Sequence, residues 1–155
     1  MHTWFECKIQ YEKTMENGMN KKVTEPYLVD ALSFTEAEAR IIEEMTPYIS
    51  GEFTVADIKR ANYSELVFSD EEAADRWFKS KLLFITLDEK SGNEKKVATN
   101  VLIQASDLRD AVKKLDEGMK GTMADYIISS MAETQIMDVY RYTDEPNVKP
   151  EFPEA

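Results

Sequence analysis

The chain has 155 residues, 43% of them hydrophobic and 32% charged, which is typical of a globular protein with one compact domain or two small fused subdomains. Its formal net charge of -11 argues against unselective binding to nucleic acid or to an anionic membrane. No apolar run reaches the about 18 residues of a membrane span, and the first residues lack the pattern of a signal peptide. We therefore expect a cytoplasmic protein without a membrane partner.

The first predicted strand runs from Trp4 to Tyr11, where apolar and polar residues alternate with the period of a half-buried strand. Residues 16–20 contain an Asn-Gly pair, which favours a hairpin turn because both residues tolerate positive φ. A second strand is predicted between Lys22 and Leu32. Since Pro26 cannot donate a ladder hydrogen bond, this strand should be an edge strand or a bulged one.

A helix is predicted after Ser33, because residues 33–36 read Ser-Phe-Thr-Glu, the pattern of a capping box. Its apolar stripe has three- and four-residue spacing, and Pro47 with Gly51 ends it. Residues 53–68 are rich in β-forming residues and predict one long bent strand or two short ones broken near Asn62. The stripe consists of Phe34, Ala37, Ile41 and Met45.

The second half repeats this order at an offset of 73 residues, which becomes 74 after the hairpin turn. Trp77-Phe78-Lys79-Ser80-Lys81 matches Trp4-Phe5-Glu6-Cys7-Lys8, and Asp107 stands where Ser33 stood as the predicted N-cap. The stripe of the second predicted helix consists of Leu108, Ala111, Leu115 and Met119.

Residues 122–142 are ambiguous, because their apolar spacing fits either a strand or a helix. We favour a strand, since the equivalent segment of the first half, residues 53–55, favours one.

The predicted fold is therefore α+β: a tandem duplication of a β-β-α-β unit, with antiparallel sheet, helices on one face and pseudo-twofold symmetry. The first repeat spans residues 1–69 and the second 77–142. Between them lies an acidic linker, residues 70–76, and after them an acidic, proline-rich tail, residues 143–155. Linker and tail together carry six of the eleven excess negative charges.

The block at residues 4–8, together with residues 21–40, resembles a domain-of-unknown-function family of bacterial and phage proteins. The most specific stretch is Phe-Thr-Glu-Ala-Glu-Ala-Arg at residues 34–40, and the resemblance covers nearly the whole chain. It implies a small cytoplasmic protein, often found in mobile-element settings, with no established catalytic residues.

Catalytic patterns are absent from the sequence. The single histidine, His2, lies at the terminus without a fixed partner, and no glycine pattern forms a phosphate loop. One cysteine, Cys7, excludes an internal disulfide and a cysteine-rich zinc site. We expect a non-enzymatic protein without a cofactor or a metal.

The remaining candidate is the sheet face opposite the helices, where the alternation places two sets of tryptophan and lysine. We expect this face to serve self-association in a homo-oligomer or the binding of a protein partner. The alternative is single-stranded nucleic acid, because rings can stack on bases while ammonium groups neutralise phosphates. The candidate residues are Trp4, Lys8, Lys22, Trp77, Lys79, Lys81 and Lys96.

Overall fold

The structure, a computed structural model, describes residues 3–141. Its fold is α+β, with two helices and two four-stranded mixed sheets, which confirms the predicted fold class. The chain divides into two compact units. Among the described residues, unit 1 comprises 3–62 and 135–141, and unit 2 comprises 63–134.

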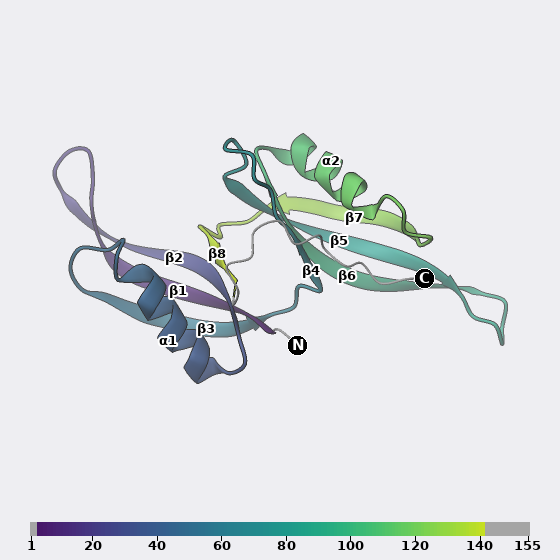
Figure 1. The fold of residues 1–155 in the computed structure, drawn as a ribbon, viewed down its shortest axis with the longest axis horizontal. Coiled ribbons are helices and arrows are strands. Elements are labelled where there is room, and N and C mark those ends of the chain that lie inside the picture. The colour runs from purple at the N-terminus through teal and green to yellow at the C-terminus, as the bar shows by residue number, and fades with distance from the viewer. Residues whose placement is uncertain (1–2, 142–155) are drawn as a thin grey trace. The chain divides into compact units, whose positions relative to one another are not determined.

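Unit 1 contains one helix and a sheet of strand order β3-β1-β2-β8 (Figure 1). Strand β1 pairs antiparallel with β2 and with β3, whereas β8 pairs parallel to β2. The elements are β1 (Thr3–Thr14), β2 (Asn20–Ala31), α1 (Phe34–Met45), β3 (Phe53–Ala61) and β8 (Val139–Tyr140).

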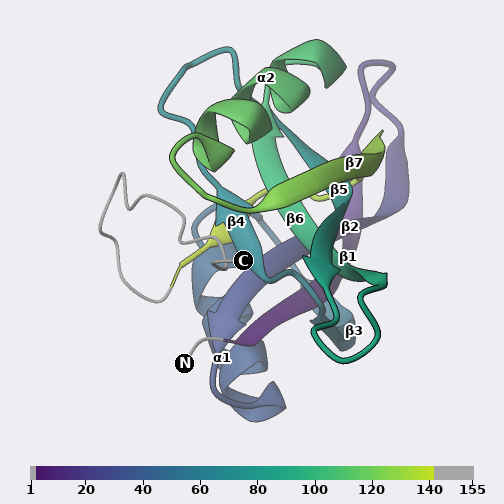
Figure 2. The same cartoon turned by 90° about the vertical axis from the view of Figure 1, so that its right-hand side faces the viewer.

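Unit 2 has the corresponding order, β4-β6-β5-β7, with β4 parallel to β6. Strand β5 pairs antiparallel with β6 and with β7. The elements are β4 (Glu65–Val67), β5 (Arg76–Leu87), β6 (Glu94–Ala105), α2 (Leu108–Met119) and β7 (Asp125–Glu133). Figure 2 shows α2 lying across one face of its own sheet.

The predicted strands after each helix are confirmed. Residues 53–68 form two strands, β3 and β4, broken at residues 62–64, and residues 122–142 contain β7 and β8 rather than a helix. The prediction of wholly antiparallel sheets is wrong, because β4 and β8 each join the sheet of the other half in parallel. Alternation reveals a strand but not its partner, which is why the sequence missed this pairing.

Both helices begin as predicted. The Ser33 hydroxyl accepts a hydrogen bond from the Glu36 amide at 3.1 Å, and the Asp107 carboxylate accepts one from the Asp110 amide at 2.8 Å. The glutamate half of the expected capping box is not formed, since Glu36 Oε1 is buried without a hydrogen-bond partner among the described residues.

Each helix packs its apolar stripe on one face of the sheet in its own unit. In unit 1 the buried stripe packs on Phe5, Cys7 and Ile9 of β1. The first residue of each predicted stripe departs from this pattern, because Phe34 is 47% exposed and Leu108 is 50% exposed. The buried stripe residues are Ala37, Ile41 and Met45 in α1, and Ala111, Leu115 and Met119 in α2.

Candidate binding face

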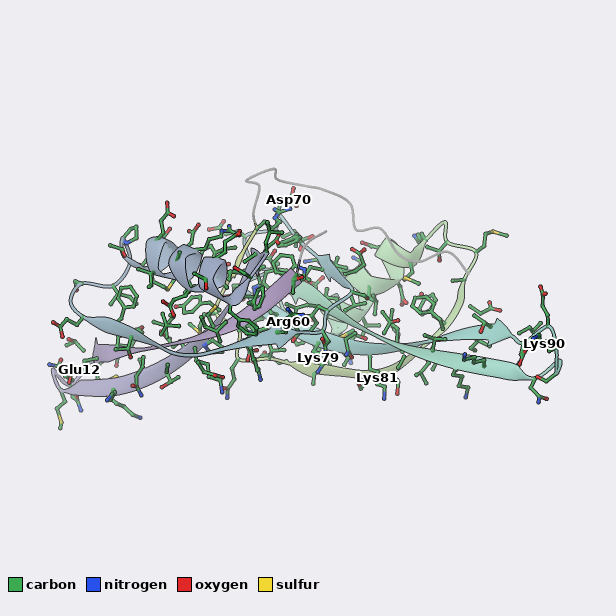
Figure 3. All side chains as sticks on the ribbon, turned by 90° about the horizontal axis from the view of Figure 1, so that it is seen from below. Glu12, Arg60, Asp70, Lys79, Lys81 and Lys90 are labelled. Atoms are coloured by element: carbon green, nitrogen blue, oxygen red, sulfur yellow. The ribbon has the colours of Figure 1, made fainter. Side chains whose placement is uncertain are left out.

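The predicted site residues of unit 2 lie on β5 and β6, on the sheet face away from α2. Phe78, Leu82 and Phe84 of β5 point into the core beneath α2. Because side chains alternate along a strand, Lys79 and Lys81 project from the opposite face, and both are exposed (Figure 3). Lys96 of β6 is also exposed. We call Lys79, Lys81 and Lys96 the lysine face.

The neighbours of the two β5 lysines carry no charge. Lys79 pairs with Leu102 on one side and Ala132 on the other. Lys81 pairs with Asn100 and Ser130. Neither ammonium group forms an ion pair with any described residue. The two positive charges are therefore left uncompensated by their immediate cross-strand neighbours.

On this face, a carboxylate lies near Lys96 but not near Lys79 or Lys81. Ile85 pairs with Lys96 on one side and with Asp125 on the other. Lys96 therefore has a carboxylate two strands away, whereas Lys79 and Lys81 do not. Any binding of anions by unit 2 should depend most on the β5 pair.

Trp77, the aromatic member of the candidate set in unit 2, is only 2% exposed. Its ring packs edge-on against Phe68 with the ring centroids 5.5 Å apart. Its carbonyl accepts hydrogen bonds from the amide and the hydroxyl of Thr134. The Trp77 ring is not accessible to a ligand. We therefore remove Trp77 from the candidate binding residues.

The candidate residues of unit 1 have a different charge environment. Trp4 and Lys8 are half-buried and Lys22 is exposed. Lys8 pairs with Asp57 of β3, and Lys22 pairs with Glu12 of β1. Lys8 and Lys22, the two candidate lysines of unit 1, therefore each have a carboxylate directly opposite.

One exchange between the two halves accounts for much of this difference. Glu6 stands in unit 1 where Lys79 stands in unit 2, and the Glu6 carboxylate forms an ion pair with Lys59 at 3.3 Å. Among the candidate lysines, therefore, only those of unit 2 lack a carboxylate directly opposite them.

Apolar residues that were not among the candidate site residues continue the lysine face. Leu83 and Ile85 of β5 are half-buried, and Ile127 of β7, which pairs with Leu83, is 42% exposed. Leu87 at the end of β5 is 71% exposed. The alternation that places Lys79 and Lys81 on this face also places Leu83, Ile85 and Leu87 there, since they are the next residues of the same parity.

Nucleophile and metal chemistry gain no support from the geometry. Cys7 is fully buried, and this burial, with the nearby Glu6 and Asp57 carboxylates, raises the pKa of its thiol to about 12. The thiol is therefore protonated at neutral pH. Within residues 3–141 no three His, Cys, Asp or Glu side chains are grouped to hold a metal. His2 lies outside the described residues.

A family model described as a domain of unknown function (DUF4494) matches residues 3–142. The chain belongs to this family. This result confirms the expected membership of a domain-of-unknown-function family. Searches of curated proteins and of solved structures found no match to the chain.

The DUF4494 match ends where the predicted acidic tail begins, and residues 143–155 of that tail lie outside the described part of the chain. Among the helices of the DUF4494 domain described here, none has the length and apolar character needed to cross a lipid bilayer. The family description gives no role to any residue. The roles proposed below therefore rest on the geometry of the two sheets.

Proposed function

We propose that this DUF4494 protein is a non-catalytic binding protein whose contact surface is the lysine face of unit 2. The observation that carries the proposal is the pair Lys79 and Lys81, which are exposed and have only uncharged cross-strand neighbours. Exposed ammonium groups without a carboxylate opposite them gain most from an anionic partner.

The proposed ligand is single-stranded nucleic acid. Lys79 and Lys81 lie two residues apart on one strand, about 7 Å along the sheet, so they can contact successive anionic groups of an extended chain. Leu83 and Ile127 beside them provide apolar surface for bases. Because Trp77 is buried, phosphate contacts rather than aromatic stacking should supply most of the affinity.

The test is the binding of a fluorescently labelled thymidine oligonucleotide at low salt, measured by anisotropy. The charge reversal Lys79→Glu/Lys81→Glu should weaken binding by at least about tenfold, and the slope of log affinity against log salt should fall by about 0.7 for each phosphate that the protein no longer neutralises. The matched control is Lys113→Glu/Lys120→Glu, which makes the same change of charge at two exposed lysines, one on α2 and one at its C-terminal end. Equal affinities of the two variants would contradict the proposal.

Self-association through the same face is the second candidate. It is favoured by the apolar residues beside the lysines, above all Leu87 and Ile127, which are 71% and 42% exposed. Light scattering should then show a dimer or larger species that Leu87→Lys/Ile127→Lys converts to a monomer. A monomeric wild type would contradict self-association and leave nucleic acid or a different protein partner as the candidates for this face.

We also propose that two segments of the chain, residues 1–69 and 77–142, are copies of one ancestral β-β-α-β segment. The pairing patterns support this. Strand β8 meets β2 at Leu28, and β4 meets β6 at Leu102, the position equivalent to Leu28 at an offset of 74. The register also shifts at equivalent points, between Lys8 and Ile9 in one unit and between Lys81 and Leu82 in the other.

A further inference from the structure

The hairpin between β1 and β2 has a hydrogen-bonded tip. The Met15 amide donates to the Met19 carbonyl at 2.8 Å, and the Gly18 amide donates to the Met15 carbonyl at 2.9 Å. Gly18 has φ of 81°, a conformation that a residue with a side chain rarely adopts. These contacts fix the register of the exposed strand ends on either side of the turn.

That register places Lys13 directly opposite Lys21. Both side chains are exposed, and neither forms an ion pair with a described residue. The adjacent carboxylate, Glu12, pairs with Lys22 and belongs to the opposite face of the hairpin. Like charges directly opposite each other destabilise a strand pair, so this arrangement works against the stability of the hairpin.

The corresponding hairpin of unit 2 lacks this repulsion. There Lys95 pairs with Thr86, whose hydroxyl donates to the Lys95 carbonyl at 3.3 Å. The like-charged pair is therefore not a requirement of a hairpin in this fold, because the other unit builds an equivalent hairpin without it.

We propose that Lys13 and Lys21 together bind a phosphate group of a single-stranded nucleic acid backbone. An anion held between the two ammonium groups turns their mutual repulsion into two attractive contacts. The flexible side chains of Met15 and Met19, 40% and 67% exposed at the tip, add apolar surface that can adapt to a base. The assignment of the ligand rests on the proposed function, whereas the site is separate from the lysine face.

The decisive variant is Lys13→Glu, because it replaces a like-charged pair with an oppositely charged one. Thermal unfolding should show a Tm raised by about 1–3 °C, since an exposed cross-strand repulsion is removed. Affinity for the labelled thymidine oligonucleotide at low salt should nevertheless fall about fivefold or more, and the salt slope should fall by about 0.7. Lys21→Glu should behave in the same way.

The matched control is Lys95→Glu, which makes the same change of charge on the other hairpin without relieving a like-charged pair. It should alter affinity less than about twofold, because it removes no proposed phosphate contact. If Lys13→Glu lowers affinity no more than Lys95→Glu does, the two lysines do not bind phosphate and the inference is overturned. Preferential binding of the wild type to anionic lipid vesicles, with no binding to the oligonucleotide, would also overturn it.

The hairpin site and the lysine face can be tested separately. Loss of affinity in Lys13→Glu but not in Lys79→Glu/Lys81→Glu would support the hairpin site and contradict the lysine face. The reverse result would overturn the hairpin site and leave the lysine face as the binding surface.

Discussion

Asp110 links three parts of unit 2 through hydrogen bonds. Its carboxylate accepts from the Ser106 amide at 2.9 Å and from the Lys114 ammonium at 2.9 Å. Lys114 in turn contacts the Ser69 hydroxyl at 2.9 Å and the Glu71 carboxylate at 3.2 Å. The Ser106 amide and Lys114 hold the pKa of Asp110 below its usual value.

This depressed pKa gives a prediction for the stability of the fold. A carboxyl whose pKa is lower in the folded state stabilises the fold above its unfolded pKa, near 4, and this stabilisation disappears as the pH falls through the folded pKa. Asp110→Asn should therefore cost about 1 kcal/mol at pH 7 and less at pH 3, which lies below the unfolded pKa. Urea unfolding at both pH values measures the difference. The exposed Glu72→Gln serves as control and should change little at either pH.

Arg40 is the counterpart of Lys114 at an offset of 74, and it also holds the chain after an added strand. Its guanidinium donates to the Asp30 carbonyl and, at 2.8 Å, to the Arg141 carbonyl. In both units, therefore, a basic residue in the middle of the helix contacts the segment that follows the parallel strand, through the Arg141 carbonyl in unit 1 and the Ser69 and Glu71 side chains in unit 2.

At the scale of elements, the start of β5 depends on packing from the segment after β4. Trp77 and Phe68 meet edge to face, and Trp77 is almost fully buried. Trp77→Ala should therefore destabilise the protein by about 3–5 kcal/mol in urea unfolding. Trp4→Ala, at the equivalent but half-buried position, should cost clearly less. Equal effects of the two substitutions would show that Trp77 is not the more deeply packed ring.

The strands and helices that could be predicted from the sequence are those with local signals. The alternation of Phe5, Cys7 and Ile9 indicated a strand face, and Ser33 and Asp107 indicated helix starts, because strand period and capping depend on neighbouring residues. The burial of Trp77 could not be predicted in this way. It depends on Phe68, which lies beside a segment whose four acidic residues indicated a solvated linker.

The sequence predicted which face of the strand carries the candidate lysines. It did not predict whether carboxylates lie opposite them. Alternation identified Lys79 and Lys81 as residues that point away from the core. Their lack of carboxylate neighbours depends on Ala132 and Ser130 of β7, whose register with β5 contains a shift. A register shift of one residue moves each side chain to the other face, so the sequence alone could not give these neighbours.

At the scale of the whole molecule, each half of the chain contributes a strand to the sheet that is mainly built by the other half. Leu66 of β4 pairs with Leu102 of β6, and Val139 of β8 pairs with Leu28 of β2. Ile136, just before β8, is only 6% exposed, so the returning segment is packed as well as hydrogen-bonded.

This exchange predicts the behaviour of a nicked chain. A protease site introduced at Glu72 and Ala73, both exposed in the loop before β5, should be cleaved in the folded protein. The two fragments should still elute together in size-exclusion chromatography and separate only in denaturant, because β4 and β8 remain in their sheets. Separation of the fragments in native buffer at micromolar concentration would contradict the prediction.

The short strand β8 also sets the order in which the protein can be completed during synthesis. Val139 follows its partner Leu28 by 111 positions, so the sheet of unit 1 lacks its fourth strand until almost all of the described chain has been made. At about 5–20 residues per second, the outer side of β2 at Leu28 and Val29 waits on the order of ten seconds for its partner. The half that leaves the ribosome first is therefore the last to be finished.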